Sequence, residues 1–375
     1  MPLPRIAQWL PLGLAAAATG AAALVWSSGT VGTSAAQAQA QAPAASPGPG
    51  SIGPMTFSND GALFAADNSA GVIYAFDLGA AGAGGAPGAR DVPGLDQKLA
   101  AILGTGADQI TVTDLAVHPL THNAYVGVMR GQGAAGRPAL FRIDGAGKID
   151  LVALNGLKST RAQLVDAPAG QSARERSNTV TDMAYSDGKL FVSGLSNEEF
   201  SSKFRTLAYP FGKVDKGASL EIFHGSHGGL ETRSPVYAFI PETLNGAAYL
   251  LASYICTPLV KFPVAGLQPG AKVRGTTVAE LGYGNRPLDM IKYSKGGRDF
   301  VLMSNTDRGV MKLAVDQIAA AKPITQPVSG ETAGAPFQTI ASMTGVEQLD
   351  ALDAQNSIVI ARADRGLNLR VVALP

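Results

Sequence analysis

Short apolar runs separated by polar turns recur along most of the chain. Between Leu288 and Val315 three such runs follow one another, interrupted by a Lys-Gly-Gly turn and by a turn of Asn, Thr, Asp and Arg. The runs are rich in Val, Ile, Leu, Phe and Tyr and are too short for a stable helix, so they predict antiparallel β-strands joined by tight turns. This stretch therefore predicts a meander of three strands.

Six copies of this meander can be aligned, with first strands that begin near residues 55, 114, 182, 236, 288 and 349. A fourth, outer strand follows most copies, at residues 149–154, 219–223, 277–281 and 338–343. Four-stranded units that recur roughly every 50 to 70 residues are typical of a β-propeller, in which sheets pack face to face around a channel. The sequence therefore predicts an all-β fold, a six-bladed β-propeller of four-stranded antiparallel blades. Seven blades, with one copy hidden, are the alternative.

Two features do not follow the repeat. Residues 95–103, between the first and second copies, have a helical pattern and predict an insertion. No segment after the third strand of the sixth copy reads as its outer strand. The pattern thus leaves open how the sixth blade is closed.

The first copy carries the residues that suggest a family. Its Ala-Asp-Asn at residues 66–68, Val-Ile-Tyr at 72–74 and Phe-Asp at 76–77 resemble the repeat of six-bladed propellers of the NHL, SMP-30/gluconolactonase and strictosidine-synthase type. The resemblance implies the same architecture for residues 51–375. SMP-30-like enzymes hold a Ca²⁺ ion at the channel mouth with Glu, Asn and Asp, but their ligand pattern is not matched here residue by residue. The resemblance therefore implies a fold rather than an activity.

Composition and charge narrow the class of partner. Charged residues make up 16% of the chain and Gly is frequent, at 45 residues, which suits short strands joined by glycine-rich turns. The formal net charge of +1 offers no attraction for a nucleic acid or an anionic membrane. Cys256 is the single cysteine, so an intrachain disulfide is excluded.

The N-terminal segment differs in composition from the rest. Arg5 precedes an apolar run at residues 10–26, and Ala-x-Ala sites follow within residues 36–42. This resembles a secretory signal peptide over residues 1–42, with an uncleaved membrane anchor as the alternative. Residues 43–50 are then a Pro/Gly/Ala-rich linker. The expectation is a periplasmic or secreted protein with no membrane span once the signal is removed.

The loops of the predicted propeller can be assigned to its two rims. Most polar residues that are not ordinary turn formers then fall on one rim. Turns between second and third strands share a rim with the links between blades, and binding sites are usually built there. A glycine-rich link carries His224, His227 and Glu231, and Cys256 follows in the next blade. Imidazole, carboxylate and thiolate suit Zn²⁺ or copper, so these four residues are the candidate metal ligands. The alternatives are an ordinary buried cysteine beside solvated histidines, or a reactive thiol.

The same rim carries arginines and amides. Guanidinium groups that face one mouth would suit a small carboxylate or phosphate ligand. The alternative is that each arginine pairs with a nearby acid, among them Asp289 and Asp307. Calcium is a third option, held by carboxylate and amide oxygens. The candidate ligand-binding residues are Arg174, Arg176, Asn197, Glu198, Asn285, Arg286, Asn305, Asp307 and Arg308.

No standard catalytic signature is present, since nucleophile-elbow, Walker A and H-E-x-x-H patterns are all missing. His118 and His122 fall on the other rim, where structural roles are expected. Catalytic residues therefore remain unassigned, and whether the protein is an enzyme is left open. Three functions compete: a copper- or zinc-dependent oxidoreductase or hydrolase with its metal at one channel mouth, a binding or scaffold propeller for a small anion or a partner protein, and a Ca²⁺-dependent lactonase-like hydrolase.

Overall fold

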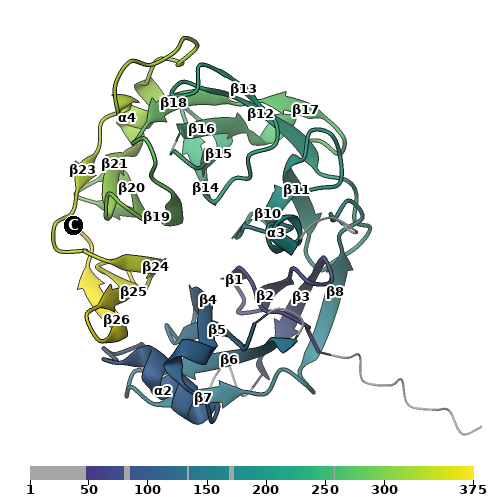
Figure 1. The fold of residues 1–375 in the computed structure, drawn as a ribbon, viewed down its shortest axis with the longest axis vertical. Helices are drawn as coiled ribbons and strands as arrows, with labels where there is room; N and C mark the ends of the chain where they lie inside the picture. Colours follow the sequence, from purple (N-terminus) through teal and green to yellow (C-terminus); the bar gives the residue numbers. More distant parts are fainter. Residues whose placement is uncertain (1–47, 80–84, 133–134, 169–172, 257) are drawn as a thin grey trace, which may run out of the picture. The chain divides into compact units, whose positions relative to one another are not determined.

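A computed structural model describes residues 48–79, 85–132, 135–168, 173–256 and 258–375. The expected signal peptide, and residues 43–47 of the expected linker, lie outside the described residues. Within the unit that spans Ser46–Pro375, six sheets are arranged around a central channel (Figure 1). The predicted six-bladed β-propeller is confirmed, and the seven-bladed alternative is wrong because each aligned copy forms one sheet.

We number the blades by the order of their inner strands along the chain. Their strands, from the channel outward, are as follows. Blade 1 contains β1 (Met55–Phe57), β2 (Leu63–Asp67), β3 (Val72–Asp77) and β8 (Lys158–Gln163). Blade 2 contains β4 (Ile110–Val117), β5 (Ala124–Arg130), β6 (Arg137–Ile143) and β7 (Ile149–Val152). Blade 3 contains β9 (Asp182–Ser186), β10 (Lys189–Leu195), β11 (Ser202–Ala208), β12 (Ala218–His224) and β13 (Gly229–Glu231), and β17 (Lys272–Arg274) pairs in parallel with β12. Blade 4 contains β14 (Ala238–Leu244), β15 (Ala247–Ser253), β16 (Pro258–Pro263), β18 (Thr276–Glu280) and β22 (Ala333–Gly334); blade 5 contains β19 (Pro287–Lys295), β20 (Arg298–Asn305), β21 (Met311–Ala314) and β23 (Gln338–Thr339); blade 6 contains β24 (Val346–Ala351), β25 (Asn356–Ala363) and β26 (Gly366–Ala373).

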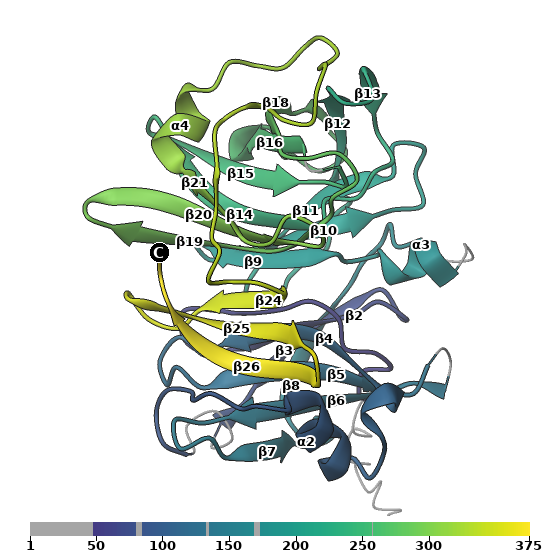
Figure 2. The same ribbon diagram turned by 60° about the vertical axis from the view of Figure 1, so that its left-hand side comes forward.

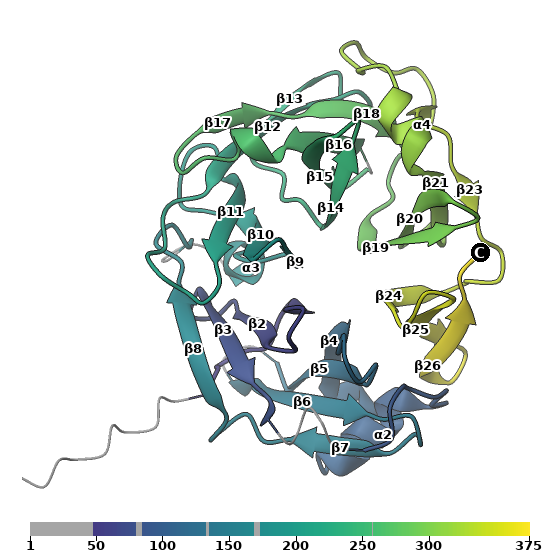
Figure 3. The ribbon, with the colours of Figure 1, turned by 180° about the vertical axis from the view of Figure 1, so that it is seen from behind.

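The order of the blades around the ring differs from their order in the chain. Strand β3 pairs with β8, which follows the whole of blade 2, so blade 2 is inserted between the third and fourth strands of blade 1. The inner strand β1 consequently lies between β4 and β9, and β4 also neighbours β24. Figure 3 shows β8 on the outside of β3 and blade 2 between blades 1 and 6. The ring therefore closes between blades 2 and 6.

The segment that precedes blade 2 closes the ring. Val92 and Leu369 exchange two backbone hydrogen bonds, and Asp91 accepts one from Val371 N–H at 2.7 Å. The helix α2 (Leu95–Ile102) follows and packs beside β26, as the turned view shows (Figure 2). The predicted helical insertion is confirmed, and the segment before it protects the outer edge of blade 6 in place of a fourth strand.

The apolar residues of each blade pack against the faces of neighbouring blades. Val126 of blade 2 and Ile360 of blade 6 belong to one fully buried cluster, and Leu251 of blade 4 and Val301 of blade 5 belong to another. The core is thus distributed between blades, as alternation of apolar residues on short strands predicts. This distribution leaves the channel and the two rims to polar side chains.

Aspartate side chains on the inner strands form hydrogen bonds that link each blade to its neighbour around the channel. Each accepts one hydrogen bond from a backbone N–H of the adjacent inner strand and one from the residue that follows it; Asp289, for example, accepts from Leu349 N–H and Met290 N–H, both at 2.8 Å. Burial raises the pKa of all four carboxyl groups, which border a cavity of about 280 Å³. The expectation that Asp289 pairs with a rim arginine is therefore wrong, because its carboxylate accepts backbone hydrogen bonds from the inner strands that border the channel. The four are Asp114, Asp182, Asp289 and Asp350.

Two further structural facts concern the N-terminal side of the chain. Gly48–Gly50, expected as part of the linker, lie against blade 1: Pro49 is buried and Gly50 N–H donates to Asp67 at 2.7 Å. In the described part of the chain, every helix is too short or too polar to span a bilayer.

Candidate metal centre

The candidate centre is built on a tight turn at the outer edge of blade 3. Strand β12 ends at His224, which pairs with Gly229 of β13. Within the turn, His227 N–H donates to His224 C=O at 3.2 Å and Gly228 N–H to Gly225 C=O at 3.1 Å. Gly228 has φ of 65°, which favours glycine at this position. The run Gly-Ser-His-Gly-Gly therefore folds back sharply and places two histidines on one short hairpin.

A single carboxylate oxygen orients both imidazoles. Oε1 of Glu231 lies 2.9 Å from Nδ1 of His224 and 2.5 Å from Nδ1 of His227, while Oε2 accepts from Ser234 Oγ at 2.7 Å. Burial works to raise the pKa of Glu231, but these hydrogen bonds outweigh it and lower the pKa to about 2. An ionised carboxylate only accepts, so each imidazole donates to Glu231 from its Nδ1 atom.

The free nitrogen of His224 faces the protein interior. The His224 residue is 1% exposed, and its Nε2 atom has no hydrogen-bond partner among the described residues. The nearest charged group is Oε2 of Glu280, at 3.7 Å, beyond hydrogen-bonding distance. A buried nitrogen without a partner is unfavourable unless something else occupies the site. This atom is therefore a candidate metal ligand.

Cys256 approaches from blade 4 in an unusual backbone conformation. It follows β15, is buried, and has φ of 61°, a left-handed value that few non-glycine residues adopt. Its N–H donates to the carbonyl of Asn285 at 2.7 Å. The side chain of Asn285 is itself fully buried and donates to Asn305 at 3.1 Å and accepts from Asp307 N–H at 3.1 Å. Blade 5 thus holds the loop that fixes the cysteine.

The turn of blade 3 and the cysteine of blade 4 meet. One ligand atom from each of His224, His227 and Cys256 lies within 4.8 Å of the other two. A tetrahedral ion with bonds of about 2.0 Å to nitrogen and about 2.3 Å to sulfur holds such atoms roughly 3.5 Å apart. The imidazole rings lie 3.8 Å apart, centre to centre. Two nitrogens and one thiolate sulfur are ligands for copper or zinc, with a fourth position left for another group.

Glu280 is a residue of the centre that sequence reasoning missed. It ends β18 fully buried, and its carboxylate accepts from Gly225 N–H at 2.6 Å and Ser226 Oγ at 2.9 Å. Burial raises the pKa of Glu280 against the opposing effect of His224. Val278 and Glu280 share one buried face of the strand. An acidic residue at an inward-facing position of a predicted strand was therefore the sequence feature that could have identified Glu280.

The position of the centre corrects one expectation. His224 and Glu231 belong to the outermost strands of blade 3, whereas the channel is lined by inner strands such as β9 and β14. The two histidines lie at the end of β12 and in the turn that joins β12 to β13, at the sheet's outer edge. The centre therefore lies at the outer seam between blades 3 and 4, away from the channel mouth.

The rim arginines are held in different ways. Arg308 forms an ion pair of 2.6 Å with Glu331, rather than with the neighbouring Asp307. Arg286 is exposed and lies over the ring of Tyr237 at 5.6 Å. Arg176 is exposed in the short helix α3 (Ala173–Ser177). The side chain of Arg174 lies outside the described residues.

The candidate calcium ligands are similarly engaged. Glu198 forms ion pairs with Lys203 at 2.6 Å and Lys216 at 2.8 Å, which lower its pKa. Asn197 is exposed beside it, while the candidate amides of blades 4 and 5, Asn285 and Asn305, bond to each other. The contacts of Glu198, Asn285 and Asn305 thus indicate that these three residues anchor loops.

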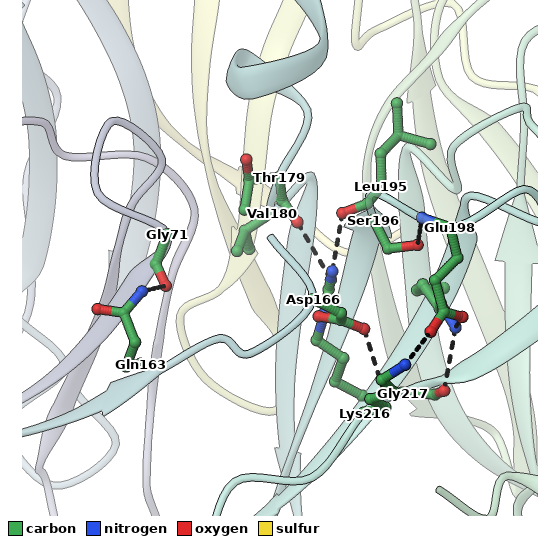
Figure 4. A network of polar contacts seen from close by, with 12 residues as sticks. Gly71, Gln163, Asp166, Thr179, Val180, Leu195, Ser196, Glu198, Lys216 and Gly217 are labelled. Carbon is green, nitrogen blue, oxygen red and sulfur yellow. Dashed lines mark hydrogen bonds and ion pairs between the residues drawn. The ribbon is translucent and has the colours of Figure 1, made fainter. Parts of the chain in front are cut away.

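A buried ionic network beside blade 3 was also missed from the sequence. Arg205 is 1% exposed; its Nε lies 2.7 Å from Oδ1 of Asp166, and its guanidinium donates to the carbonyls of Thr179 at 3.2 Å and Leu195 at 2.7 Å. Figure 4 shows Asp166, Thr179 and Leu195 converging on this position. The first four residues of β11, Ser202–Arg205, are all buried, and their mixed polar and apolar types do not distinguish this buried arginine from an exposed one. Its contacts indicate a structural role.

Comparisons with known proteins add little beyond the architecture. No protein-family model and no curated protein matches the sequence. Among solved structures, the chain is similar to the soluble aldose sugar dehydrogenase of Escherichia coli in its apo-form, with 10% identity, a TM-score of 0.33, and coverage of 86% of this chain and 96% of that one. It is also similar to the PQQ-bound aldose sugar dehydrogenase of Streptomyces coelicolor, with 11% identity, a TM-score of 0.31, and coverage of 86% of this chain and 94% of that one. A streptogramin B lyase is similar at 10% identity, with a TM-score of 0.28 and coverage of 88% of this chain and 95% of that one. Likeness at this level transfers no activity, and the fold assignment rests on the sheets themselves.

Proposed function

We propose that the protein binds one copper or zinc ion between His224, His227 and Cys256, and that this ion is the centre of its chemistry. Two observations carry the proposal: Nε2 of His224 is buried without a hydrogen-bond partner among the described residues, and one ligand atom each of His224, His227 and Cys256 lie within 4.8 Å of one another. Three converging soft donors are favoured by these metals over calcium, which prefers oxygen.

Each residue of the centre has a distinct role in this proposal. His224 and His227 supply Nε2 nitrogens, and Cys256 supplies the thiolate. Glu231 holds both rings in the tautomer that binds metal, the arrangement common around metal-bound histidines. Glu280 fixes the turn through Gly225 and lies close enough to accept a proton from a group bound beside His224.

An ion with three protein ligands keeps a position open for a small molecule, which is the requirement for a metal-dependent oxidoreductase or hydrolase. Export to the periplasm or the cell exterior, proposed from the leader-like residues 1–42, would bring the apoprotein to its metal there. A small-anion or scaffold function receives less support, because Arg308 is neutralised by Glu331.

Elemental analysis tests the proposal. Protein purified without chelator should contain about one copper or zinc ion per chain. Cys256→Ser and His227→Ala should lose it, and His122→Ala, which alters an exposed histidine in the turn between β4 and β5, should retain it. Wild-type protein without stoichiometric metal after reconstitution, or equal metal in all variants, would contradict the proposal.

A further inference from the structure

A cavity of about 570 Å³ opens on the rim opposite the metal centre. It is bordered by the turns that follow the first strands of blades 1 and 2, by the ends of β3 and β11, and by the start of β8. The metal centre lies instead where the fourth strand of blade 3 and the second strand of blade 4 end, so the two sites share no residue. Small-molecule sites in proteins commonly have volumes of about 300–1,000 Å³. The cavity is therefore large enough for a ligand of its own.

A buried histidine presents a hydrogen-bond donor to this cavity. His118 lines it, is 6% exposed, and is neutral at pH 7 because burial lowers its pKa. Its Nδ1 atom accepts from the N–H of Leu120 at 3.2 Å and of Thr121 at 3.3 Å, so the ring proton is on Nε2. Nε2 has no hydrogen-bond partner among the described residues. A Cβ atom at Gly61, which also lines the cavity, would lie 2.7 Å from Nε2, so the glycine leaves this donor uncovered.

Two carboxylates and a phenol hydroxyl lie together in the same cavity. Asp60, in the turn between β1 and β2, and Asp77, at the end of β3, are both exposed and line it. Burial raises the pKa of Tyr209, and the charges of Asp60 and Asp77 raise it further, so both carboxylates lie near this hydroxyl. The Tyr209 ring packs edge to face on Phe64, with 4.8 Å between ring centres. Each carboxylate accepts a hydrogen bond through Oδ1 only, so its Oδ2 is without a partner among the described residues.

Lys158 adds a positive charge to the wall of the cavity. It begins β8 directly opposite Asp77 of β3, and its exposed ammonium forms no ion pair within the described part of the chain. Leu120, which is 68% exposed, and Pro210 contribute apolar surface. The cavity thus combines two donors, the lysine ammonium and the imidazole N–H, with two carboxylate acceptors and apolar side chains.

This mixture of donors and acceptors selects among classes of small molecule. A sugar hydroxyl both donates and accepts, so the hydroxyls of one sugar can donate to the carboxylates and accept from the ammonium and the imidazole. An organic amine would be repelled by Lys158 and would leave the Nε2–H of His118 without an acceptor. An organic acid would be repelled by both carboxylates. A neutral polyhydroxylated molecule is the class that satisfies both kinds of group.

From these observations we infer that the cavity binds a neutral mono- or disaccharide. Its polar contacts are Asp60, Asp77, His118 and Lys158. Hydrogen bonds to ionised groups are stronger than those between neutral groups, so the affinity depends mainly on the two carboxylates and the ammonium. The inference is independent of the proposed metal, because no residue of the cavity belongs to the metal centre.

Isothermal titration calorimetry with the purified chain tests the inference. The probes are D-glucose, D-galactose, D-mannose, maltose and cellobiose, with putrescine as an organic diamine and D-gluconate as an organic acid. Two variants remove the charged contacts, Asp60→Ala/Asp77→Ala and Lys158→Ala. The matched controls Asp299→Ala/Asp364→Ala and Lys322→Ala remove the same charges at exposed positions outside the cavity. Circular dichroism confirms that each variant is folded.

At least one of the five sugars should bind to the wild type in a saturable manner. The double carboxylate variant should weaken this binding by roughly tenfold or more, and Lys158→Ala by roughly threefold or more. Both controls should stay within about twofold of the wild type. The bound sugar should also protect the Lys158 amine from acetylation, measured by mass spectrometry, while Lys322 reacts at an unchanged rate.

Three outcomes would overturn the inference. The first is that none of the sugars binds, and the second is that putrescine or D-gluconate binds in preference to them. The third is that a sugar binds equally to the wild type and to both cavity variants, which would place it elsewhere on the protein. If the double variant does not fold, Lys158→Ala and the protection of its amine decide the result. Metal content enters none of these measurements, so the metal centre stands or falls separately.

Discussion

Val92 and Leu369 exchange two backbone hydrogen bonds, of 2.9 and 3.0 Å, at the place where the ring of blades closes. In this chain an early segment closes the last blade because blade 2 is inserted into blade 1. The closure completes the ring. Because it joins segments far apart in the sequence, its formation costs a large loop-closure entropy.

Breaking this closure should destabilise the whole propeller. In Val92→Pro the chain loses the N–H that bonds to Leu369, and the carbonyl left behind is partly shielded from water. We expect the free energy of unfolding to fall by about 1–3 kcal/mol, measured by urea denaturation. Lys98→Ala on the exposed face of α2 serves as the control and should change it by less than about 0.5 kcal/mol. Equal stability of the two variants would show that the closure contributes nothing.

The buried pair of Arg205 and Asp166 should be costly to break. Arg205→Met leaves an uncompensated buried carboxylate, so the free energy of unfolding should fall by about 3–5 kcal/mol. Arg298→Met breaks the exposed pair with Asp316 and should cost less than about 1 kcal/mol. Urea denaturation of both variants provides the comparison, and similar small losses would assign the network no structural role.

The channel carboxylates predict that mild acid stabilises the protein. Burial raises their pKa values in the folded state, that of Asp350 to about 6, so the folded protein binds protons that the unfolded chain releases. Their contribution is fully present below the unfolded pKa of about 4 and is lost as the pH rises through the folded values. Acids with lowered pKa, such as Glu231 at about 2, contribute in the opposite sense, and their stabilisation is lost as the pH falls below about 4.5.

Thermal unfolding at a series of pH values should therefore show maximum stability near about pH 4.5 and a decline at higher pH. Asp350→Asn should flatten the part of this decline that lies between about pH 4 and 6, while keeping an acceptor for Val117 N–H. A wild-type stability that rises steadily from pH 5 to 8 would exclude raised pKa values in the channel.

Glu231 should control metal affinity, because its carboxylate holds both imidazoles in place. A Gln at this position has an uncharged amide that orients the two rings poorly, so affinity should fall roughly 10- to 100-fold. Competition titration with a chelator of known affinity measures the change, and Glu199→Gln, an exposed neighbour in blade 3, provides the matched control. Unchanged affinity in Glu231→Gln would remove it from the centre.

The fold was predictable wherever apolar residues alternate in short runs, and this pattern accounts for the number of blades. The ring order was not predictable, because β8 is almost entirely exposed and polar, Lys-Ser-Thr-Arg-Ala-Gln, and carries no strand signal. The closure at Val92 rests on one isolated bridge, which leaves no periodic trace. Both features depend on pairing between distant segments rather than on local pattern.

The candidate centre was predictable in part. Sorting loops by rim correctly anticipated that His224, His227 and Cys256 lie together, although metal binding stays a prediction. It included Glu231 among the candidate ligands, whose carboxylate faces the Nδ1 atoms of both rings, and it missed Glu280. Such roles depend on side-chain direction at a seam between blades, which residue spacing alone does not determine.

Anomalous diffraction from crystals of the metal-loaded protein, recorded at the copper and zinc absorption edges, tests the central claim most directly. We predict one strong peak at the seam between blades 3 and 4, about 2.3 Å from the Cys256 sulfur and about 2.0 Å from Nε2 of His224 and of His227. A peak among the channel aspartates instead, or no peak at the seam at full metal occupancy, would contradict the account.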